Sequence, residues 1–343
     1  MPSLFTHLVF AEEAVVGALG DAGRDLLATH GCLLRFAAQG PDFFYHNQRT
    51  MPTGLRYGVA LHRRGFGAFV GELVREAQRL HLGVGSELGA FTLGFATHAV
   101  LDRRTHPYIV YRSGWVDPQK PETRRLRFCH PFLERILDVL VLQERRQLSP
   151  GDFDFLPLVR GRGLPYVVLK AFVKGLHAVY PTMTRKSLDR RRIENAYHDT
   201  MFFYKLTNHR NPDIHRLAYR KDQRDGFQER RMALLHPREV PAGIDFLNRA
   251  GAPWRHPCAP DEASRAGFLE LYEEALAESV TMTRRLAEAL AGHASPAEAA
   301  RAVGDQSLDT AREPCTPVVS DPFPLPEILD GLYREMEAAS AGR

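Results

Sequence analysis

The segment THAVLDRRTHP (97–107) contains two histidines and an aspartate spaced four residues apart, His98, Asp102 and His106. The residues that precede them are apolar and lack proline, which predicts a mostly buried helix over 86–104. Residues four apart lie on one face of a helix, so these side chains should form one stripe of metal-type donors. Burying imidazole and carboxylate groups is costly unless they are paired, so other parts of the chain must supply their partner.

Further donors of the same kind lie before and after this stripe. His7 lies just ahead of the first predicted helix, Asp42 lies in a loop, QGPDFFYHN, and His62 lies in the next helical segment. His130 and Glu134 form an H-x-x-x-E pair, one turn apart at the start of a later helix. Any one of these residues alone is more often structural. Together they exceed the three or four donors that one zinc ion needs, and they suit two or three adjacent ions.

The elements that must position these donors are helical. Periodic apolar residues predict helices over 11–31, 57–80, 86–104, 130–148, 163–180, 190–208, 268–292, 296–303 and 325–339. There is no run of alternating strands and no internal repeat, so the predicted fold class is all-α. A break near residue 150 separates a metal-binding helical core, 1–150, from an additional helical region, 151–343, and the two could pack as one domain.

Composition indicates a folded protein, and its charge is unevenly distributed along the chain. The chain has 343 residues, 44% of them apolar, which is enough for one large folded domain or two smaller ones. The net charge of +4 is uneven, because residues 185–238 contain 14 Lys and Arg against 7 Asp and Glu. This basic stretch could attract the phosphates of lipids or nucleic acids, or it could be a solvated helical face with paired charges.

The lack of recognisable targeting signals and the wide spacing of the cysteines predict a cytoplasmic protein. The N-terminal residues lack the features of a signal peptide, and no apolar run approaches the length of a transmembrane segment. The four cysteines (Cys32, Cys129, Cys258 and Cys315) are far apart, so neither a disulfide framework nor a thiolate zinc site is expected. Peripheral contact with a membrane surface remains open.

The order of the donors resembles the bacterial zinc-dependent phospholipase C family, whose all-α fold is related to that of the fungal single-strand-specific nucleases. The resemblance covers roughly residues 1–150. It rests on His7, on Asp42 in GPDFFYHN, on His62 in ALHRRG, on His98, Asp102 and His106 in THAVLDRRTHPYI, and on His130 and Glu134 in HPFLE. It implies a multi-helix bundle of that type, here with additional C-terminal helices.

The resemblance also implies a ligand set for zinc. One ion would be bound by Asp42, His62, His98 and Asp102, and a second by His106, His130 and Glu134. A third would be held by His7 and by Asp102 as a bridge. Secreted members complete the third site with an N-terminal tryptophan. This chain begins Met-Pro-Ser, so Pro2 is the corresponding candidate and the third ion depends on it.

The expected function is that of a zinc-dependent phosphoester hydrolase similar to phospholipase C, in which metal-activated water attacks a phosphate diester. Asp42 would either accept the proton of that water or serve only as a metal ligand. Phospholipid is one candidate substrate. A nuclease or phosphatase on the same scaffold is an alternative, with nucleic acid the less favoured partner. An alternative of another class is a non-catalytic zinc-binding structural or regulatory protein.

One later patch, 245–264, contains Trp254, His256 and Cys258. It could form a lid in which His256 contacts phosphate, or it could be a packed loop whose Trp254 fills a gap between the two halves of the chain.

Overall fold

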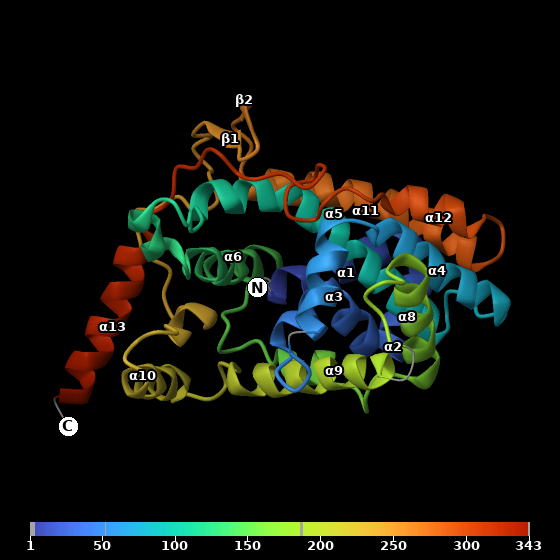
Figure 1. The fold of residues 1–343 in the computed structure, drawn as a ribbon, viewed down its shortest axis with the longest axis horizontal. Coiled ribbons are helices and arrows are strands. Elements are labelled where there is room, and N and C mark those ends of the chain that lie inside the picture. Colours follow the sequence, from blue (N-terminus) through green and yellow to red (C-terminus); the bar gives the residue numbers. More distant parts are fainter. Residues whose placement is uncertain (1–3, 52, 186–187, 342–343) are drawn as a thin grey trace.

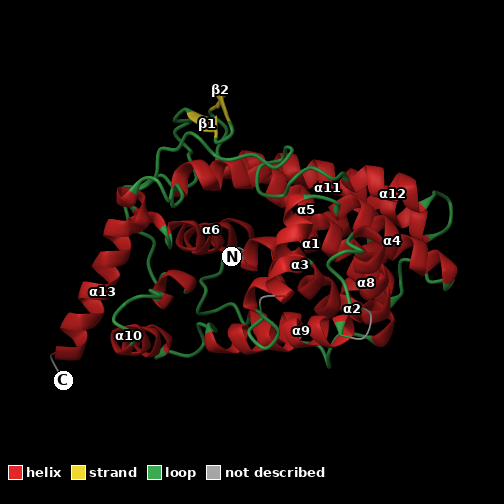
Figure 2. Ribbon diagram, in the orientation of Figure 1, coloured by secondary structure: helices red, strands yellow, loops and turns green. Residues whose placement is uncertain are grey.

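The computed structural model of the chain describes residues 4–51, 53–185 and 188–341. In this part of the chain, helices dominate and one short two-stranded hairpin is the only sheet (Figure 2). The predicted all-α class is therefore confirmed. No helix in these ranges combines the length and the apolar character that crossing a membrane would require.

Most helices follow one another through short connections (Figure 1). The α-helices are α1 (Leu4–Leu19), α2 (Asp21–Ala37), α3 (Thr53–Arg63), α4 (Phe66–Arg79), α5 (Glu87–Ser113), α6 (Cys129–Arg146), α7 (Phe155–Val159), α8 (Tyr166–Val179), α9 (Asp189–Leu206), α10 (Ile214–Arg224), α11 (Phe268–Leu290), α12 (Pro296–Val303) and α13 (Leu325–Ala341). The 3-10 helices are η1 (Gly40–His46), η2 (Pro121–Leu126) and η3 (Arg231–Leu234), and the antiparallel strands are β1 (Trp254–His256) and β2 (Ala259–Ser264).

Several element boundaries differ from the sequence-based prediction. The segment 57–80 forms two helices, because the chain turns at Gly65 with φ of +78°, a conformation that glycine adopts readily. The buried helix predicted over 86–104 continues through Pro107 to Ser113. His7 lies inside α1 rather than ahead of it.

Helix α5 is the centre around which the other helices pack. It is buried along almost its whole length and contacts α1, α2, α4, α6, α8 and α11. One face carries Phe91 and Phe95, which pack against Phe172 of α8, while the helix also buries the polar side chains of His98, Asp102 and His106. Residues from both sides of position 150 contribute to this one hydrophobic core.

A buried carboxylate fixes the start of α1 against α6. Asp138 of α6 accepts hydrogen bonds from the backbone N–H of Phe5, at 3.1 Å, and of Thr6, at 2.8 Å. It also accepts one from the Thr6 hydroxyl, and its Oδ2 lies 2.9 Å from His236 Nε2. The first N–H groups of a helix have no partner within the helix, so a carboxylate is a favourable cap. Asp138 thereby sets the position of His7, one turn into α1.

Two of the four cysteines form a disulfide. Cys258, beside the hairpin, is bonded to Cys315, and the two Cα atoms lie 6.2 Å apart although 57 residues separate them in the sequence. Cys32 and Cys129 are free thiols. The expectation that the cysteines form no disulfide is therefore wrong, because sequence distance concealed their proximity. The cysteines consequently no longer support a reducing compartment.

Replacing Asp138 with alanine should destabilise the protein. The substitution leaves the buried N–H groups of Phe5 and Thr6 without an acceptor, so we expect the free energy of unfolding to fall by at least about 2 kcal/mol. Denaturant unfolding would measure the change. Glu122→Ala, at an exposed position of η2, is the control and should stay within about 0.5 kcal/mol of wild type. Equal stability of the two variants would contradict the role given to Asp138.

Candidate metal centre

Five separate elements bring all eight predicted donors to one place. The donors are His7 from α1, Asp42 from η1, His62 from α3, His98, Asp102 and His106 from α5, and His130 and Glu134 from α6. The three residues of α5 form the expected stripe, and the other elements surround it. Their role as metal ligands stays a prediction, but their ligating atoms form two groups that could hold metal ions.

The first group is buried and centres on two carboxylates. Its members are His7, Asp42, His98 and Asp102, each of which offers a ligand atom within 4.8 Å of the others. His98 Nε2 lies 3.0 Å from Asp102 Oδ2 and 3.7 Å from Asp42 Oδ2. His62 adjoins this group, with Nε2 2.9 Å from Asp42 Oδ1. The geometric group therefore contains His7, which the resemblance assigned to a separate third ion, whereas His62, which the resemblance assigned to this ion, lies beside the group through Asp42.

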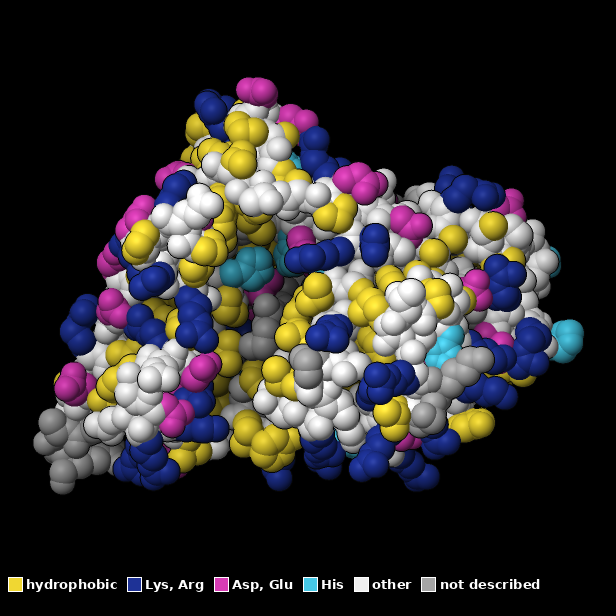
Figure 3. Space-filling model, viewed as in Figure 1, with side chains coloured by type: hydrophobic (Ala, Val, Ile, Leu, Met, Phe, Trp, Pro, Cys, Tyr) yellow, Lys and Arg dark blue, Asp and Glu magenta, His cyan; other side chains and the backbone are white. Residues whose placement is uncertain are grey.

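The second group lies nearer the surface. It consists of His106, His130 and Glu134, and its ligand atoms are also within 4.8 Å of one another. Glu134 Oε1 lies 3.3 Å from His106 Nε2 and 3.1 Å from His130 Nε2. The side chains of His106 and His130 are 11% and 28% exposed, whereas His98 is fully buried. Histidine side chains are visible in a hollow on the face shown in Figure 3.

Asp102 connects the two groups. Its Oδ1 lies 3.1 Å from His7 Nε2 and 3.8 Å from His106 Nε2, while its Oδ2 faces His98. One carboxylate therefore approaches imidazoles of both groups. This is the arrangement that a carboxylate bridging two adjacent cations would require.

Glycine at position 40 allows η1 to approach α5. Gly40 has φ of +54°, and a Cβ placed there would lie only 2.2 Å from Cγ of the His98 ring. Any larger residue would therefore collide with His98 and would be strained by the positive φ. The absence of a side chain at Gly40 lets the backbone pass over His98 and carry Asp42, two residues later, into the first group.

Backbone carbonyls orient two of the histidines. The Nδ1 atom of His62 lies 2.9 Å from the carbonyl oxygen of Gly58, and that of His98 lies 3.3 Å from the carbonyl oxygen of Ala38. A ring whose Nδ1–H donates to a carbonyl presents its Nε2 lone pair on the opposite side, where the carboxylates lie. Histidines that bind metals are commonly held in this way.

The electrostatics of the site are dominated by buried negative charge. Burial alone disfavours the charged form of Asp42, but the imidazoles of His98 and His62 outweigh this effect and hold the pKa of Asp42 below its usual value. Burial also opposes the protonation of His62, yet the nearby Asp42 raises the pKa of His62 to about 9. Burial likewise opposes the protonation of His106, but the charges around it, Asp102 first, raise the pKa of His106 to about 10. Cations, whether protons or metal ions, are thus favoured beside these carboxylates.

The donor set fits divalent ions. Within the described residues, His98 Nε2 and Asp102 Oδ2 are buried and face each other at 3.0 Å, but neither makes a hydrogen bond of good geometry. Buried polar atoms are nearly always satisfied, and a bound cation would satisfy both of these at once. Imidazole nitrogen and carboxylate oxygen are also ligand types that transition metals accept.

Two further polar groups lie beside the site: Tyr45, which the sequence offered as lining either the site or the core, and Asp309, which it missed. Tyr45 Oη lies 3.4 Å from His62 Nδ1, and Asp309 Oδ1 lies 3.9 Å from His106 Nδ1. Asp309 follows α12 and had no sequence signal, because no motif connects it with the donors. His256 hydrogen-bonds the carbonyl oxygen of Thr310, which gives it a role in packing. Pro2, the candidate ligand of the third ion, lies outside the described residues.

The variant Gly40→Ala should disrupt the first group. The new methyl would displace the His98 ring, so we expect fewer bound ions per chain and a loss of stability above about 1 kcal/mol. Metal content, measured by mass spectrometry, and thermal unfolding would report these effects. Gly83→Ala is the matched control, since nothing lies within 4 Å of its added Cβ. Wild-type metal content in Gly40→Ala would refute this account of η1.

Removing bound metal should lower thermal stability. An ion that binds only the folded state, at a concentration 1,000 times its Kd, contributes about 4 kcal/mol, and its loss also leaves Asp42, Asp102 and Glu134 without that compensation. We expect chelator dialysis to reduce the midpoint of thermal unfolding and zinc to restore it. An unchanged midpoint after complete removal of metal would argue against ion binding at these groups.

Comparisons with known proteins assign no family to the chain. No family model matches the chain, and neither curated proteins nor solved structures yield a match. The metal-binding interpretation therefore rests on the chemistry and geometry of the donors.

Proposed function

We propose that the protein is a zinc-dependent phosphoester hydrolase with a site similar to that of phospholipase C. The observation that carries this proposal is the pair of donor groups joined by Asp102. A purely structural zinc site needs four donors around one ion, whereas these eight donors suit adjacent ions. The second group is the more exposed of the two, with the side chains of His106 and His130 11% and 28% exposed, which leaves it accessible to a substrate. The phospholipase C-type bundle is part of the same proposal.

Zinc is the metal that best suits this donor set. Imidazole and carboxylate ligands are typical of catalytic zinc sites, which retain a position for water. Two imidazoles and one carboxylate, as in the second group, would also suit iron. Elemental analysis of protein purified without added metals would therefore identify the bound metal. We expect about two zinc ions per chain. Iron as the main metal would contradict the assignment.

The residues of the chain would hold the reacting groups rather than react covalently. When bound, zinc supplies polarisation of a phosphoryl oxygen and makes a water molecule more acidic. Asp42 has one oxygen 2.9 Å from His62 Nε2 and the other 3.7 Å from His98 Nε2. We assign Asp42 to metal ligation through this arrangement, with the second oxygen as acceptor for the proton of an attacking water.

Exposed apolar side chains favour a phospholipid over nucleic acid as substrate. Helix α9 packs on η1, which carries Asp42, through the stacking of Phe203 on His46. On its outer side α9 exposes Phe202 and Leu206 by 59% and 55%. Large apolar residues within a basic segment suit the surface of a phospholipid membrane.

The basic segment itself gives less support to nucleic-acid binding. Several of its arginines are engaged by acidic residues, as in the pairs Arg192–Asp189 and Arg231–Asp222. Paired arginines contribute less to binding a phosphate backbone. The alternative of a solvated face with paired charges therefore accounts for part of the stretch.

Hydrolysis of phosphatidylcholine tests the proposal. Zinc-loaded protein should release phosphocholine and diacylglycerol from short-chain phosphatidylcholine, with lower rates on an oligonucleotide and on a phosphate monoester. Asp42→Asn should reduce the rate by about 100-fold or more, because it removes a charged ligand and a proton acceptor. His293→Ala, at an exposed position after α11, is the control and should retain activity.

The outcomes separate the candidate functions. Turnover of the oligonucleotide alone would replace phospholipid with nucleic acid as the substrate. If zinc-loaded wild type hydrolyses none of the three substrates, the hydrolase proposal fails and a structural or regulatory zinc protein is favoured.

A further inference from the structure

A segment far along the chain lies against the metal centre. Residues 303–315, here called the strap, begin at the last residue of α12 and pass beside α3 and α5. The backbone N–H of Leu308 donates to the carbonyl oxygen of His62 at 2.7 Å. The guanidinium of Arg103, next to Asp102 on α5, donates to three carbonyl oxygens at the start of the strap, those of Val303, Gly304 and Gln306.

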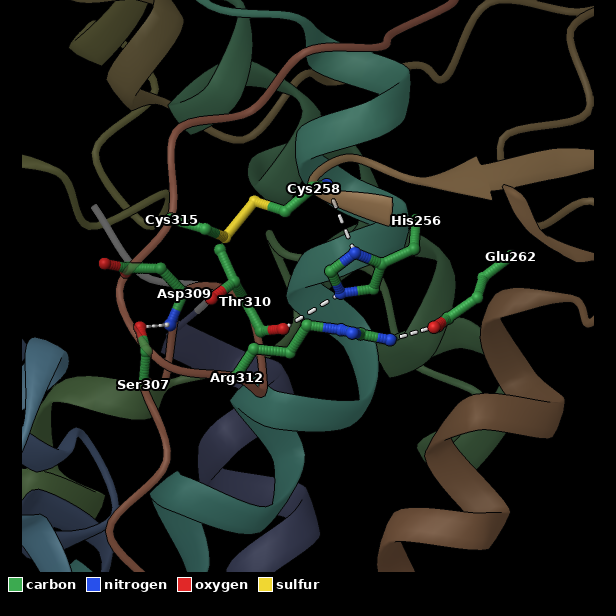
Figure 4. Close-up of a disulfide and its surroundings, with 8 residues drawn as sticks. All are labelled: His256, Cys258, Glu262, Ser307, Asp309, Thr310, Arg312 and Cys315. Atoms are coloured by element: carbon green, nitrogen blue, oxygen red, sulfur yellow. Dashed lines mark hydrogen bonds and ion pairs between the residues drawn. A yellow bond between two sulfur atoms is a disulfide. The ribbon is translucent and has the colours of Figure 1, made fainter. Parts of the chain in front are cut away.

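The other end of the strap is tied to the hairpin (Figure 4). Cys315 forms the disulfide with Cys258, and His256 Nε2 lies 2.9 Å from the carbonyl oxygen of Thr310. His256 Nδ1 accepts the N–H of Cys258, so the ring has its proton on Nε2, where it donates to Thr310. Arg312 pairs with Glu262 of β2. The strap is therefore anchored on both sides of Asp309.

Asp309 faces the side of His106 that does not face the other donors. His106 Nε2 lies towards Glu134 and Asp102, whereas His106 Nδ1 lies 3.9 Å from Asp309 Oδ1. His106 Nδ1 is buried and has no hydrogen-bond partner among the described residues. In His62 and His98 the equivalent nitrogen has a backbone carbonyl as its neighbour. For His106, the group that faces this nitrogen is a carboxylate on the strap, that of Asp309.

We propose that Asp309 is the positioning carboxylate of His106, accepting the Nδ1–H so that Nε2 presents its lone pair to a metal ion in the second group. This inference rests on the proposed metal-dependent function. A distance of 3.9 Å is too long for a direct hydrogen bond, so the proposal requires the Asp309 carboxylate to move about 1 Å closer by side-chain rotation, or one water molecule to bridge the two groups. Asp309 can rotate, because its side chain is 47% exposed.

The consequence is measurable in the binding of metal. Partners of this kind fix the tautomer and orientation of a ligating histidine, and their loss typically costs about 10–100-fold in metal affinity. Asp309→Ala should therefore weaken the affinity for one bound ion by about 10–100-fold, as measured by competition with a chromophoric chelator. It should also alter the visible absorption spectrum of the cobalt-substituted protein, which reports the ligand geometry.

Two further variants separate positioning from general effects. Asp309→Asn keeps an oxygen that can accept the Nδ1–H, so it should retain more affinity than Asp309→Ala. Glu313→Ala removes an acidic group from an exposed position of the same strap and should match wild type. Circular dichroism would verify that each variant is folded.

Three results would overturn the proposal. Wild-type affinity and an unchanged cobalt spectrum in Asp309→Ala would show that Asp309 does not act on His106. An equal loss in Glu313→Ala would show that only the charge of the strap matters. Absence of divalent-ion binding in the wild type would refute the proposed function and this inference together. If the wild type binds its ions and no variant changes that binding, this inference alone is refuted.

Discussion

The burial of three carboxylates is the constraint on which the rest of the site depends. Asp42, Asp102 and Glu134 are only 4%, 2% and 2% exposed, and an uncompensated charge at such a position costs several kcal/mol. Five imidazoles approach these groups, each through Nε2. Either protons on the histidines or metal ions between them must balance the charge, and both donor groups could hold such ions. The balance of charge therefore depends on how the carboxylates and imidazoles are arranged together.

The helical framework serves this arrangement by limiting how far each donor can move. Helix α5 is held on every side by other helices, so the stripe of His98, Asp102 and His106 has a rigid base. The Asp138 cap fixes α1 and therefore His7, while Gly40 permits the close approach that brings in Asp42. Donors held by secondary structure keep a geometry that loops would lose.

The long helices follow from local sequence patterns, but three features of the fold were not predicted from them. Periodic apolar residues predicted the long helices, because a helix repeats its buried face every few residues whatever it packs against. The break at Gly65, the extension of α5 through Pro107 and the hairpin near Trp254 were not predicted. The break at Gly65 is a local effect of a positive φ at glycine, whereas the continuation of α5 through Pro107 runs against local propensity in a helix that packs against many others.

The sequence by itself determined which residues are candidate donors, since histidines and carboxylates spaced four apart on helices share a face whatever the final packing. Only the tertiary structure decided how they are grouped. It placed His7 with Asp42, joined both groups through Asp102, paired Cys258 with Cys315, and brought Asp309 to His106 across some 200 residues of chain. The physical reason is that periodicity records which side of an element is buried, whereas contacts between elements depend on how all of them pack together.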